Sequence, residues 1–351
     1  MGIARSISIF TAIACLPAAV LWKALTTAYA PYNKHRSMRR ILGDSLYRYI
    51  ITTSVALRLE APVGSTLDVY TKWAGKTKIP VVVDELEDGA KLLWIGEKQL
   101  DNVILFVHGG GFAVPPRESS LAFWNHVRRE MEKKGVQPGI VMLSYTLWPE
   151  STFPTPLKQI QHAVQFLLTS GVHPSRVQLA GDSAGGNMIM QLVLHTLHPH
   201  PSIDPFTLPS PIKAIHLFSP WVNLQADSPS YDSNDGIDYM PKAALVWQGS
   251  RILADVPPSS LHYVDSARAP ESWFAGIQGV VDSILITAGE CECMRDDILQ
   301  LGALLQRHHG KVEVVVQPGG FHEDMFLDFD WGTEVGILTP LIVERLVEGF
   351  R

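Results

Sequence analysis

A serine framed by two glycines stands where a strand pattern gives way to a helical pattern. The residues Gly181–Gly185 read Gly-Asp-Ser-Ala-Gly, after the apolar run Val177–Ala180 and before a helical run that starts at Gly185. A serine hydroxyl is a weak nucleophile unless a base reaches it, and a tight strand-to-helix turn exposes its oxygen to that base. Glycines leave room for the turn because they carry no Cβ. The context predicts that Ser183 is a catalytic nucleophile.

A glycine-rich loop at His108–Phe112 follows another strand pattern, Val103–Val107. Three consecutive glycines let backbone N–H groups point at one spot, where they stabilise the oxyanion that forms when a serine attacks a carbonyl group. We expect the N–H groups of Gly110 and Gly111 to donate there, together with that of Ala184. A phosphate-binding loop is disfavoured, because no Lys-Ser/Thr pair follows and the G-x-G-x-x-G spacing is not met.

His322 is the predicted general base. It lies in the glycine-containing segment Pro318–Glu323, just beyond the last strand pattern at Val312–Val316. An elbow of this kind is followed along the chain by an acid and then by a histidine. The pair His308 and His309 ends an amphipathic helical run and is interpreted as surface or capping residues.

The acid is expected between the serine and the histidine, in the loop after the strand pattern Ile284–Thr287. That loop, residues 289–297, contains several carboxylates. Any of them could hold the imidazole in its reactive tautomer and stabilise the imidazolium. Spacing alone does not choose among them, and Asp296 and Asp297 fit equally well as caps of the next helix.

Short β-branched runs alternate with longer helical patterns along most of the chain. Apolar runs bounded by Gly, Pro or Asp suit strands buried on both faces of a mostly parallel sheet, and their alternation with helices indicates a doubly wound α/β fold. The eight strands are predicted at Val81–Val83, Leu92–Ile95, Val103–Val107, Ile140–Ser144, Val177–Ala180, Ile215–Ser219, Ile284–Thr287 and Val312–Val316. The helices between them are predicted at Leu121–Lys134, Pro156–Ser170, Gly185–Leu197 and Arg295–His308.

Two segments depart from this alternation. Residues 221–275 contain no clean strand pattern and mix Pro, Ser and Asp with large apolar side chains, which in a compact domain is typical of a functional lid. Residues 37–59 read as a helix that either packs on the main domain or forms part of that lid.

The N-terminus is apolar and uncharged from Ile7 to Leu21. About 20 apolar residues are needed to span a bilayer, so three interpretations remain: a signal anchor, a cleaved signal peptide, or a buried cap helix. Basic residues concentrate after the segment, which by the positive-inside rule leaves the following domain cytoplasmic, although Arg5 lies on the other side. We expect an anchor or signal-like segment at 1–30, N-terminal cap helices at 31–65 and a catalytic domain at 66–351 with a cap insertion around 221–275.

The charge and cysteine content exclude several classes of protein. The net charge is −6, from 29 basic and 35 acidic residues, and there is no basic stripe to neutralise a phosphate backbone, so nucleic acid is not expected as a partner. The three cysteines, Cys15, Cys291 and Cys293, do not match the spacing of a disulfide framework or a zinc site. We expect no metal and no organic cofactor.

The motifs together resemble the hormone-sensitive-lipase branch of the α/β hydrolases, which includes arylacetamide deacetylase and the fungal steryl acetyl hydrolases. The resemblance runs from Val103 to Phe329 and includes the glycine loop, the elbow and the segment Tyr145–Glu150. It implies an α/β-hydrolase fold with a mostly parallel eight-stranded sheet flanked by helices and covered by a helical cap. The family places its acid three residues before an Arg-Asp pair. That position is Glu292 here, with Asp296 as the alternative.

The resemblance also implies the kind of substrate and its surroundings. A cap built from N-terminal helices and the insertion would favour a hydrophobic ester with a short acyl group, such as an acetylated sterol or secondary metabolite. The expected lining residues are Phe112, Trp221, Met240, Trp247 and Phe326. The relatives are anchored in the membrane of the endoplasmic reticulum, several with a luminal catalytic domain, which conflicts with the orientation that the charges predict.

Two other functions fit the same motifs. The triad could serve acyl transfer or cyclisation in a biosynthetic pathway if the cap excludes water. The scaffold also resembles non-catalytic hormone receptors, but these have lost the catalytic histidine, and His322 is present here. The leading prediction is therefore a serine esterase or deacetylase. The sequence carries no indication of the oligomeric state.

Overall fold

Apolar runs of five or six residues form the central sheet, because each buries side chains on both faces. The computed structural model describes residues 3–59 and 64–351 of the chain. In β3 all five residues are buried, with Val103 and Leu105 in one apolar cluster and Ile104 and Phe106 in another across the sheet. The strands are β1 Val83–Glu85, β2 Lys91–Trp94, β3 Val103–Val107, β4 Gly139–Ser144, β5 Val177–Asp182, β6 Ala214–Phe218, β7 Ile284–Gly289 and β8 Val312–Gln317.

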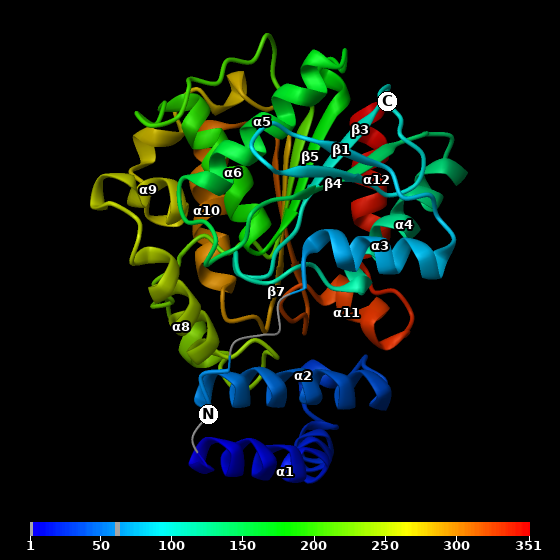
Figure 1. Ribbon diagram of the computed structural model, residues 1–351, viewed down its shortest axis with the longest axis vertical. Helices are drawn as coiled ribbons and strands as arrows, with labels where there is room; N and C mark the ends of the chain where they lie inside the picture. Colours follow the sequence, from blue (N-terminus) through cyan, green and yellow to red (C-terminus); the bar gives the residue numbers. More distant parts are fainter. Residues whose placement is uncertain (1–2, 60–63) are drawn as a thin grey trace.

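The eight strands make one sheet in the order β1-β2-β4-β3-β5-β6-β7-β8 (Figure 1). The pairs β1–β2 and β2–β4 are antiparallel and the remaining pairs are parallel, so the predicted mostly parallel eight-stranded sheet is confirmed. The first strand begins two residues later than predicted. The N–H of Val82 donates to the hydroxyl of Tyr70 at 3.0 Å, so ladder pairing starts only at Val83.

Helices cover both faces of this sheet (Figure 1). One face carries α5, α6 and α10, and the other carries α3, α4, α11 and α12. The helices are α1 Ile3–Thr27, α2 Met38–Ala56, α3 Thr66–Thr77, α4 Glu118–Lys133, α5 Thr155–Thr169, α6 Ala184–Leu197, α7 Ser230–Ser233, α8 Lys242–Leu253, α9 Leu261–Val264, α10 Arg295–His308, α11 Asp324–Trp331 and α12 Leu338–Phe350.

Helix α3 was not among the predicted elements, although its start is marked in the sequence. Ser65 Oγ accepts from the N–H of Asp68 at 3.0 Å, and Asp68 Oδ2 accepts from the N–H of Ser65 at 3.1 Å. This reciprocal pair is a capping box, which satisfies N–H groups that a helix start otherwise leaves unpaired. Helices α11 and α12, which follow the last strand, were also not predicted from the sequence.

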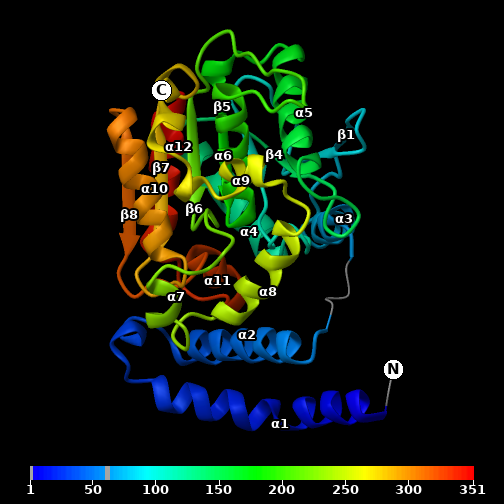
Figure 2. The same cartoon turned by 90° about the vertical axis from the view of Figure 1, so that its left-hand side faces the viewer.

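The segment 221–275 contains three short helices, α7, α8 and α9, and no strand. It leaves the sheet after β6 and returns at β7. Helices α7 and α8 lie toward the end of the molecule that carries α1 and α2, whereas α9 lies beside α6 (Figure 2). The predicted absence of strands in this segment agrees with the structure.

Helix α2 is joined to the main domain by buried ion pairs. Arg40 contacts Asp44, Asp324 and Asp328 at 2.6 to 2.8 Å, and Arg36 contacts Asp44 and Asp324 at 2.6 and 2.7 Å. Buried charges are tolerated only when they are paired in this way. The predicted N-terminal cap segment is thus ordered over most of its length, and its residues 60–63 lie outside the described residues.

Helix α1 lies outside α2, across the end of the molecule (Figure 2). The hydroxyl of Tyr49 in α2 donates to the carbonyl of Ala12 at 2.8 Å. The most apolar 18-residue window within Ser6–Thr27 has a mean hydropathy of 1.8, and only 6% of that window is buried. By length and composition this helix could cross a membrane, and a signal sequence would pass the same test. It is not the buried cap helix that was one of the three interpretations.

Candidate active site

Ser183 occupies a strained turn between β5 and α6. Its backbone has φ 48° and ψ −117°, a region that non-glycine residues seldom adopt. The N–H of Ser183 donates to the carbonyl of Phe218 at 3.0 Å, and the N–H of Trp221 donates to the carbonyl of Ser183 at 3.0 Å. The end of the adjacent strand β6 and the loop that follows it therefore hold the turn at both the N–H and the carbonyl of the serine.

The two flanking glycines are required by close packing. A Cβ at Gly181 would lie 2.6 Å from the carbonyl carbon of Gly185, and a Cβ at Gly185 would lie 1.9 Å from the carbonyl oxygen of Val107. Real Cβ atoms do not approach other atoms this closely, so α6 starts against the end of β3 only because both positions are glycine. The steric reason given from the sequence for these glycines agrees with the structure.

The glycine loop after β3 is joined to the elbow by a side chain. The N–H of Gly109 donates to Asp182 Oδ2 at 2.9 Å, so the residue before Ser183 fixes the loop. Gly110 and Gly111 have φ values of 99° and 59°, and a Cβ at Gly110 would lie 2.3 Å from the carbonyl oxygen of Val114. Only glycine adopts this path without strain.

The predicted oxyanion donors are unpaired. Across residues 3–59 and 64–351, the N–H groups of Gly110, Gly111 and Ala184 donate to no protein atom. Ala184 is buried, where backbone N–H groups are nearly always paired, and Gly110 and Gly111 are partly exposed. Three unpaired groups around one serine therefore suit an acceptor that arrives with a substrate.

His108, at the start of the glycine loop, is held by contacts with Tyr145 and Thr66. Its ring stacks on Tyr145 at 4.6 Å between centroids, its Nε2 lies 3.2 Å from the hydroxyl of Thr66, and burial lowers its pKa to about 4. The Tyr145 hydroxyl donates to the carbonyl of His108 at 3.1 Å. His108 is therefore a neutral side chain that supports the loop, and the resemblance motif at Tyr145 has a structural role beside it.

The loops after β7 and β8 bring Glu292 and His322 together. His322 Nδ1 lies 3.5 Å from Glu292 Oε2, and the two side chains are 2% and 0% exposed. The N–H of Cys291 donates to the carbonyl of Gly320 at 2.8 Å, which joins the two loops. The arrangement matches the acid and base predicted from the resemblance.

The other carboxylates of the acid loop have different partners. Glu290 Oε2 accepts from the N–H of Gly319 at 2.7 Å. Asp296 pairs with its neighbour Arg295 at 2.9 Å. Asp297 accepts from the side chains of Asn223 and Ser228, each at 3.1 Å. Of the four, the structure places only Glu292 at the imidazole, a distinction that spacing alone did not make.

His322 carries more negative charge around it than a triad requires. Burial by itself would lower the pKa of its imidazole, but the carboxylates of Glu323, Glu292 and Asp238 outweigh burial and raise the pKa above its ordinary value. Burial also raises the pKa of Glu292, against the opposing effect of the imidazole. A protonated imidazole at this position is therefore stabilised on several sides.

One of those carboxylates, Glu323, was not identified from the sequence. Its Oε1 lies 3.5 Å from Nε2 of His322, and its Oε2 accepts from Arg117 Nη2 at 2.9 Å. Burial and the charge of Glu323 raise the pKa of Asp182 well above its usual range. Burial would raise the pKa of Glu323 too, but His322 and Arg117 outweigh it and lower that pKa. The two shifts have opposite directions, so a proton shared by this pair favours Asp182 over Glu323.

The serine and the histidine are not hydrogen-bonded in this structure. Within the described residues, Ser183 Oγ makes no hydrogen bond to His322, whose Nε2 lies near Glu323 instead. Hydrogen bonds between catalytic groups are often long without substrate and shorten in the complex. The structure therefore brings the loops of the triad together and leaves the last contact unmade.

We expect Glu323→Gln to move the acidic limb of the pH–kcat/KM profile to lower pH. The base must be neutral to accept a proton, and loss of the Glu323 charge removes a cause of the raised pKa of His322. The profile is measured with an ester substrate from pH 4 to 9. Glu344→Gln, at an exposed position of α12, is the control and should leave the limb in place. A shift to higher pH in Glu323→Gln would contradict the assignment.

The predicted lining residues divide into two groups. Phe112 and Trp221 lie beside the elbow, with ring centroids 6.3 Å apart, while Met240 and Trp247 lie on the cap at partly exposed positions. Phe326 is fully buried and makes edge contacts with Phe123 and Phe106 in the core beneath the sheet. The structure does not bring Phe326 to the site, because α11 turns that side chain toward α4, and we leave it out of the proposed lining.

The cap contacts the glycine loop through a residue that the sequence did not single out. Gln248 Nε2 in α8 donates to the carbonyl of Gly111 at 3.0 Å. Gln248 Cγ would be 3.2 Å from a Cβ at Gly111. The cap is therefore closed over the predicted oxyanion donors, and Ser183 is only 5% exposed.

The strand order, and an elbow after β5 with acid and histidine loops after β7 and β8, define the architecture of an α/β hydrolase. The family model for the alpha/beta hydrolase fold matches residues 104–326, more than half of the chain, so the protein belongs to this family. Within the family it resembles the hormone-sensitive-lipase branch, as its motifs predicted.

Several known proteins share part of the chain. An esterase of Gibberella moniliformis is 26% identical over 149 residues, which is 41% of this chain and 43% of that protein. Arylacetamide deacetylase of Oryctolagus cuniculus is 28% identical over 156 residues, 42% of this chain and 37% of that protein. Steryl acetyl hydrolase 1 of Saccharomyces cerevisiae is 29% identical over 124 residues, 35% and 27% of the two chains. The matched part spans less than half the length of these relatives.

Solved structures share the fold more completely. The crystal structure of an esterase from the bacterial hormone-sensitive lipase family superposes with a TM-score of 0.64 at 22% identity, over 87% of this chain and 97% of that chain. An esterase/lipase from an uncultured bacterium gives a TM-score of 0.65 at 19% identity, over 89% and 97%. The α/β-hydrolase fold predicted from the sequence is therefore confirmed.

Proposed function

We propose that this chain is a serine carboxylic ester hydrolase that forms an acyl-enzyme on Ser183. The observation that carries the proposal is the positive-φ turn at Ser183 with the unpaired N–H groups of Gly110, Gly111 and Ala184 around it. A nucleophile beside unpaired donors suits acyl transfer through a tetrahedral oxyanion. The names of the relatives, an esterase, a deacetylase and a steryl acetyl hydrolase, support the same class of reaction.

Each step assigns one task to one group. Ser183 Oγ attacks the ester carbonyl while His322 Nε2 takes its proton, and Glu292 stabilises the imidazolium through Nδ1. The carbonyl oxygen becomes the oxyanion and accepts from the three N–H groups. The alcohol then leaves with the proton from His322. Water attacks the acyl-serine by the same sequence, and the carboxylic acid is released.

We propose a lipophilic alcohol and a short acyl group as the halves of the substrate. Phe112 and Trp221 put aromatic surface beside the elbow, and Met240 and Trp247 add apolar surface from the cap. Apolar walls around a few polar groups are usual for small-molecule sites. An acetylated sterol or secondary metabolite has this chemistry.

Purified protein is expected to hydrolyse p-nitrophenyl acetate faster than p-nitrophenyl esters of long acids, because the closed cap leaves little room beside Ser183. Rapid quenching during turnover should trap an acetyl group on the peptide that contains Ser183, read by mass spectrometry. No hydrolysis and no adduct would reject the proposed function. Equal rates for acetate and long-chain esters would reject only the short acyl group.

The closed cap also favours a second candidate, acyl transfer or cyclisation with the same triad. Ser183 and His322 are 5% and 2% exposed, so water reaches the acyl-enzyme poorly while the cap is shut. Incubation of an acetyl ester with an alcohol acceptor separates the two, since an esterase releases acetate and a transferase forms a new ester in excess of it.

We propose that α1 associates with a membrane, with the endoplasmic reticulum as the expected location. Large apolar side chains of α1 are exposed, among them Phe10 at 74% and Trp22 at 72%, and burial of such surface in lipid is favourable. The protein should float with phospholipid vesicles in a density gradient. Recovery of full-length protein only in the dense fractions, with and without 1 M salt, would reject this part of the proposal.

A further inference from the structure

One buried carboxylate from the cap joins the two loops that carry the acid and the base. Asp238 is 0% exposed. Its Oδ2 accepts from the N–H of Cys293 at 3.0 Å, and its Oδ1 accepts from the N–H of His322 at 3.3 Å. Cys293 directly follows Glu292, so the two oxygens of a single side chain set the relative positions of Glu292 and His322.

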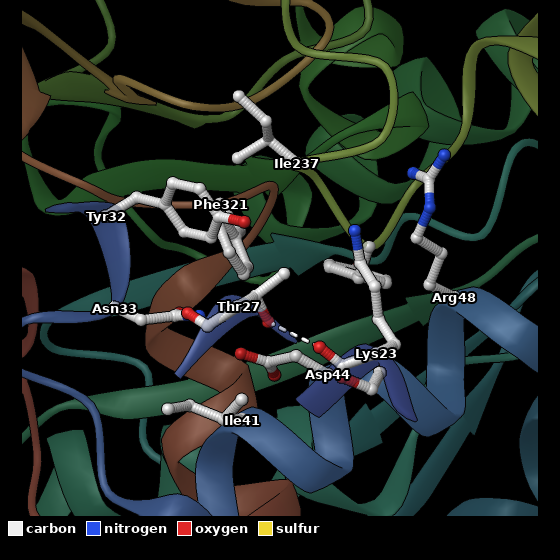
Figure 3. Close-up of a pocket in the computed structure, with 11 residues that line it drawn as sticks. Lys23, Thr27, Tyr32, Asn33, Ile41, Asp44, Arg48, Ile237 and Phe321 are labelled. Atoms are coloured by element: carbon white, nitrogen blue, oxygen red, sulfur yellow. Dashed lines mark hydrogen bonds between the residues drawn. The ribbon is translucent and has the colours of Figure 1, made fainter. Parts of the chain in front are cut away.

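Side chains of the N-terminal helices α1 and α2 bind the backbone turn that carries Asp238. Lys23 Nζ in α1 donates to the carbonyl of Gly236 at 2.7 Å. Arg48 Nη1 in α2 donates to the carbonyl of Asp238 at 2.5 Å, and its Nη2 contacts Asp235 Oδ1 at 3.0 Å. Figure 3 shows Lys23 and Arg48 pointing toward the segment that carries Ile237, beside a pocket also lined by Phe321.

We propose that Asp238 is a positioning residue for the catalytic pair, and that α1 and α2 hold it in place through the backbone of residues 235–238. The inference rests on the proposed function and adds a dependence of catalysis on the N-terminal helices. A misplacement of reacting groups by about 1 Å lowers a rate by up to about a hundredfold. A shift of either loop would separate Glu292 from the imidazole by such an amount.

Asp238 also acts on His322 through its charge. The carboxylates that face the imidazole are Glu292 after β7, Glu323 after β8 and Asp238 from the cap. Behind Glu323 lie Arg117 at the start of α4 and Asp182 of the elbow, whose pKa is raised by burial and by the charge of Glu323. Burial raises the pKa of Asp238 to about 7, against the opposing effects of His322 and the two N–H groups. Its charge is therefore present above about pH 7 and lost below it.

The test compares Asp238→Asn with the wild-type enzyme on p-nitrophenyl acetate. The amide keeps one acceptor oxygen but turns an N–H₂ toward the second loop, so we expect kcat to fall about tenfold to a hundredfold with KM within about twofold. The dependence of kcat/KM on pH should change as well, because the variant lacks a charge that titrates near neutrality. Asp232→Asn is the matched control, since Asp232 is 76% exposed on α7 and pairs only with Lys242 within the described residues; it should leave kcat and the profile unchanged.

A second variant keeps the test decisive if Asp238→Asn does not fold. Arg48→Gln leaves Asp238 intact but weakens the hold on its backbone, and we expect a fall of about threefold to tenfold in kcat at unchanged KM. An unchanged kcat in Arg48→Gln, or in a folded Asp238→Asn, would overturn the inference about Asp238. Esterase activity of the wild-type enzyme in the same assay would still support the proposed function. A wild-type enzyme without esterase activity would overturn both.

Discussion

Ser183→Ala is expected to abolish hydrolysis of p-nitrophenyl acetate almost completely. The alanine keeps the positive-φ turn of the elbow but has no oxygen to form the acyl-enzyme. Removal of a triad nucleophile costs a factor of a thousand to a million in kcat, and the activity that remains comes from the oxyanion donors and from binding. We therefore expect a loss of at least about a thousandfold in kcat.

The melting temperature should change little in this variant, since one hydroxyl is removed and Ser183 Oγ makes no hydrogen bond to His322 in the described part of the chain. Ser250→Ala, at an exposed position of α8, controls for the loss of a serine elsewhere in the cap. Ser250→Ala should keep the turnover of the wild type. If Ser183→Ala kept it as well, the nucleophile would have to be sought outside the elbow.

Glu292→Gln is expected to give the second-largest loss. The amide has nearly the shape of the carboxylate, but it cannot stabilise the imidazolium and it favours the wrong tautomer of His322. An acid-to-amide change of this kind lowers kcat by about ten-thousandfold in a serine triad. A loss of a hundredfold or more is expected here, because Glu323 and Asp238 leave His322 with two further carboxylates.

Asp296→Asn is the matched control for the acid. Asp296 follows in the same loop and was the alternative from the sequence, but its carboxylate pairs with Arg295. We expect its kcat to stay within about twofold of the wild type. The reverse ranking of the two variants, measured on the same ester with thermal unfolding as a check, would transfer the acid role to Asp296.

The groups that follow a strand directly were predictable from the sequence. Ser183, His322 and the glycine loop each come immediately after an apolar run, and neighbouring parallel strands place their carboxyl ends along one edge. The choice of Glu292 as the acid needed more than the strand pattern, because its loop contains three other carboxylates. Only the family resemblance distinguished Glu292 from these three. The strand pattern was therefore sufficient for the architecture, and residue identity within a loop was not.

The residues that were missed act over long separations in the chain. Asp238 contacts the N–H of His322 across 84 positions, and Arg117 reaches Glu323 across 206 positions. No local pattern marks such pairs, since each acidic side chain reads by itself as a solvated surface group. The prediction that Phe326 lines the site was wrong for a related reason. An aromatic residue near the base in the sequence can face either the core or the substrate, and its packing against Phe106 and Phe123 places it in the core.

Two paired arginines, Arg36 just before α2 and Arg40 within it, limit how far the N-terminus could be shortened without loss of the fold. Arg36 and Arg40 neutralise Asp44, Asp324 and Asp328, and removal of one partner from a buried pair destabilises a protein by about 3–5 kcal/mol. A cut after Ala30 would spare this network, but it would remove α1 and with it the contact of Lys23 with the carbonyl of Gly236. A cut beyond Arg40 would leave Asp324 and Asp328 buried without their arginine partners, so the fold is expected to require the chain from Arg36 onward.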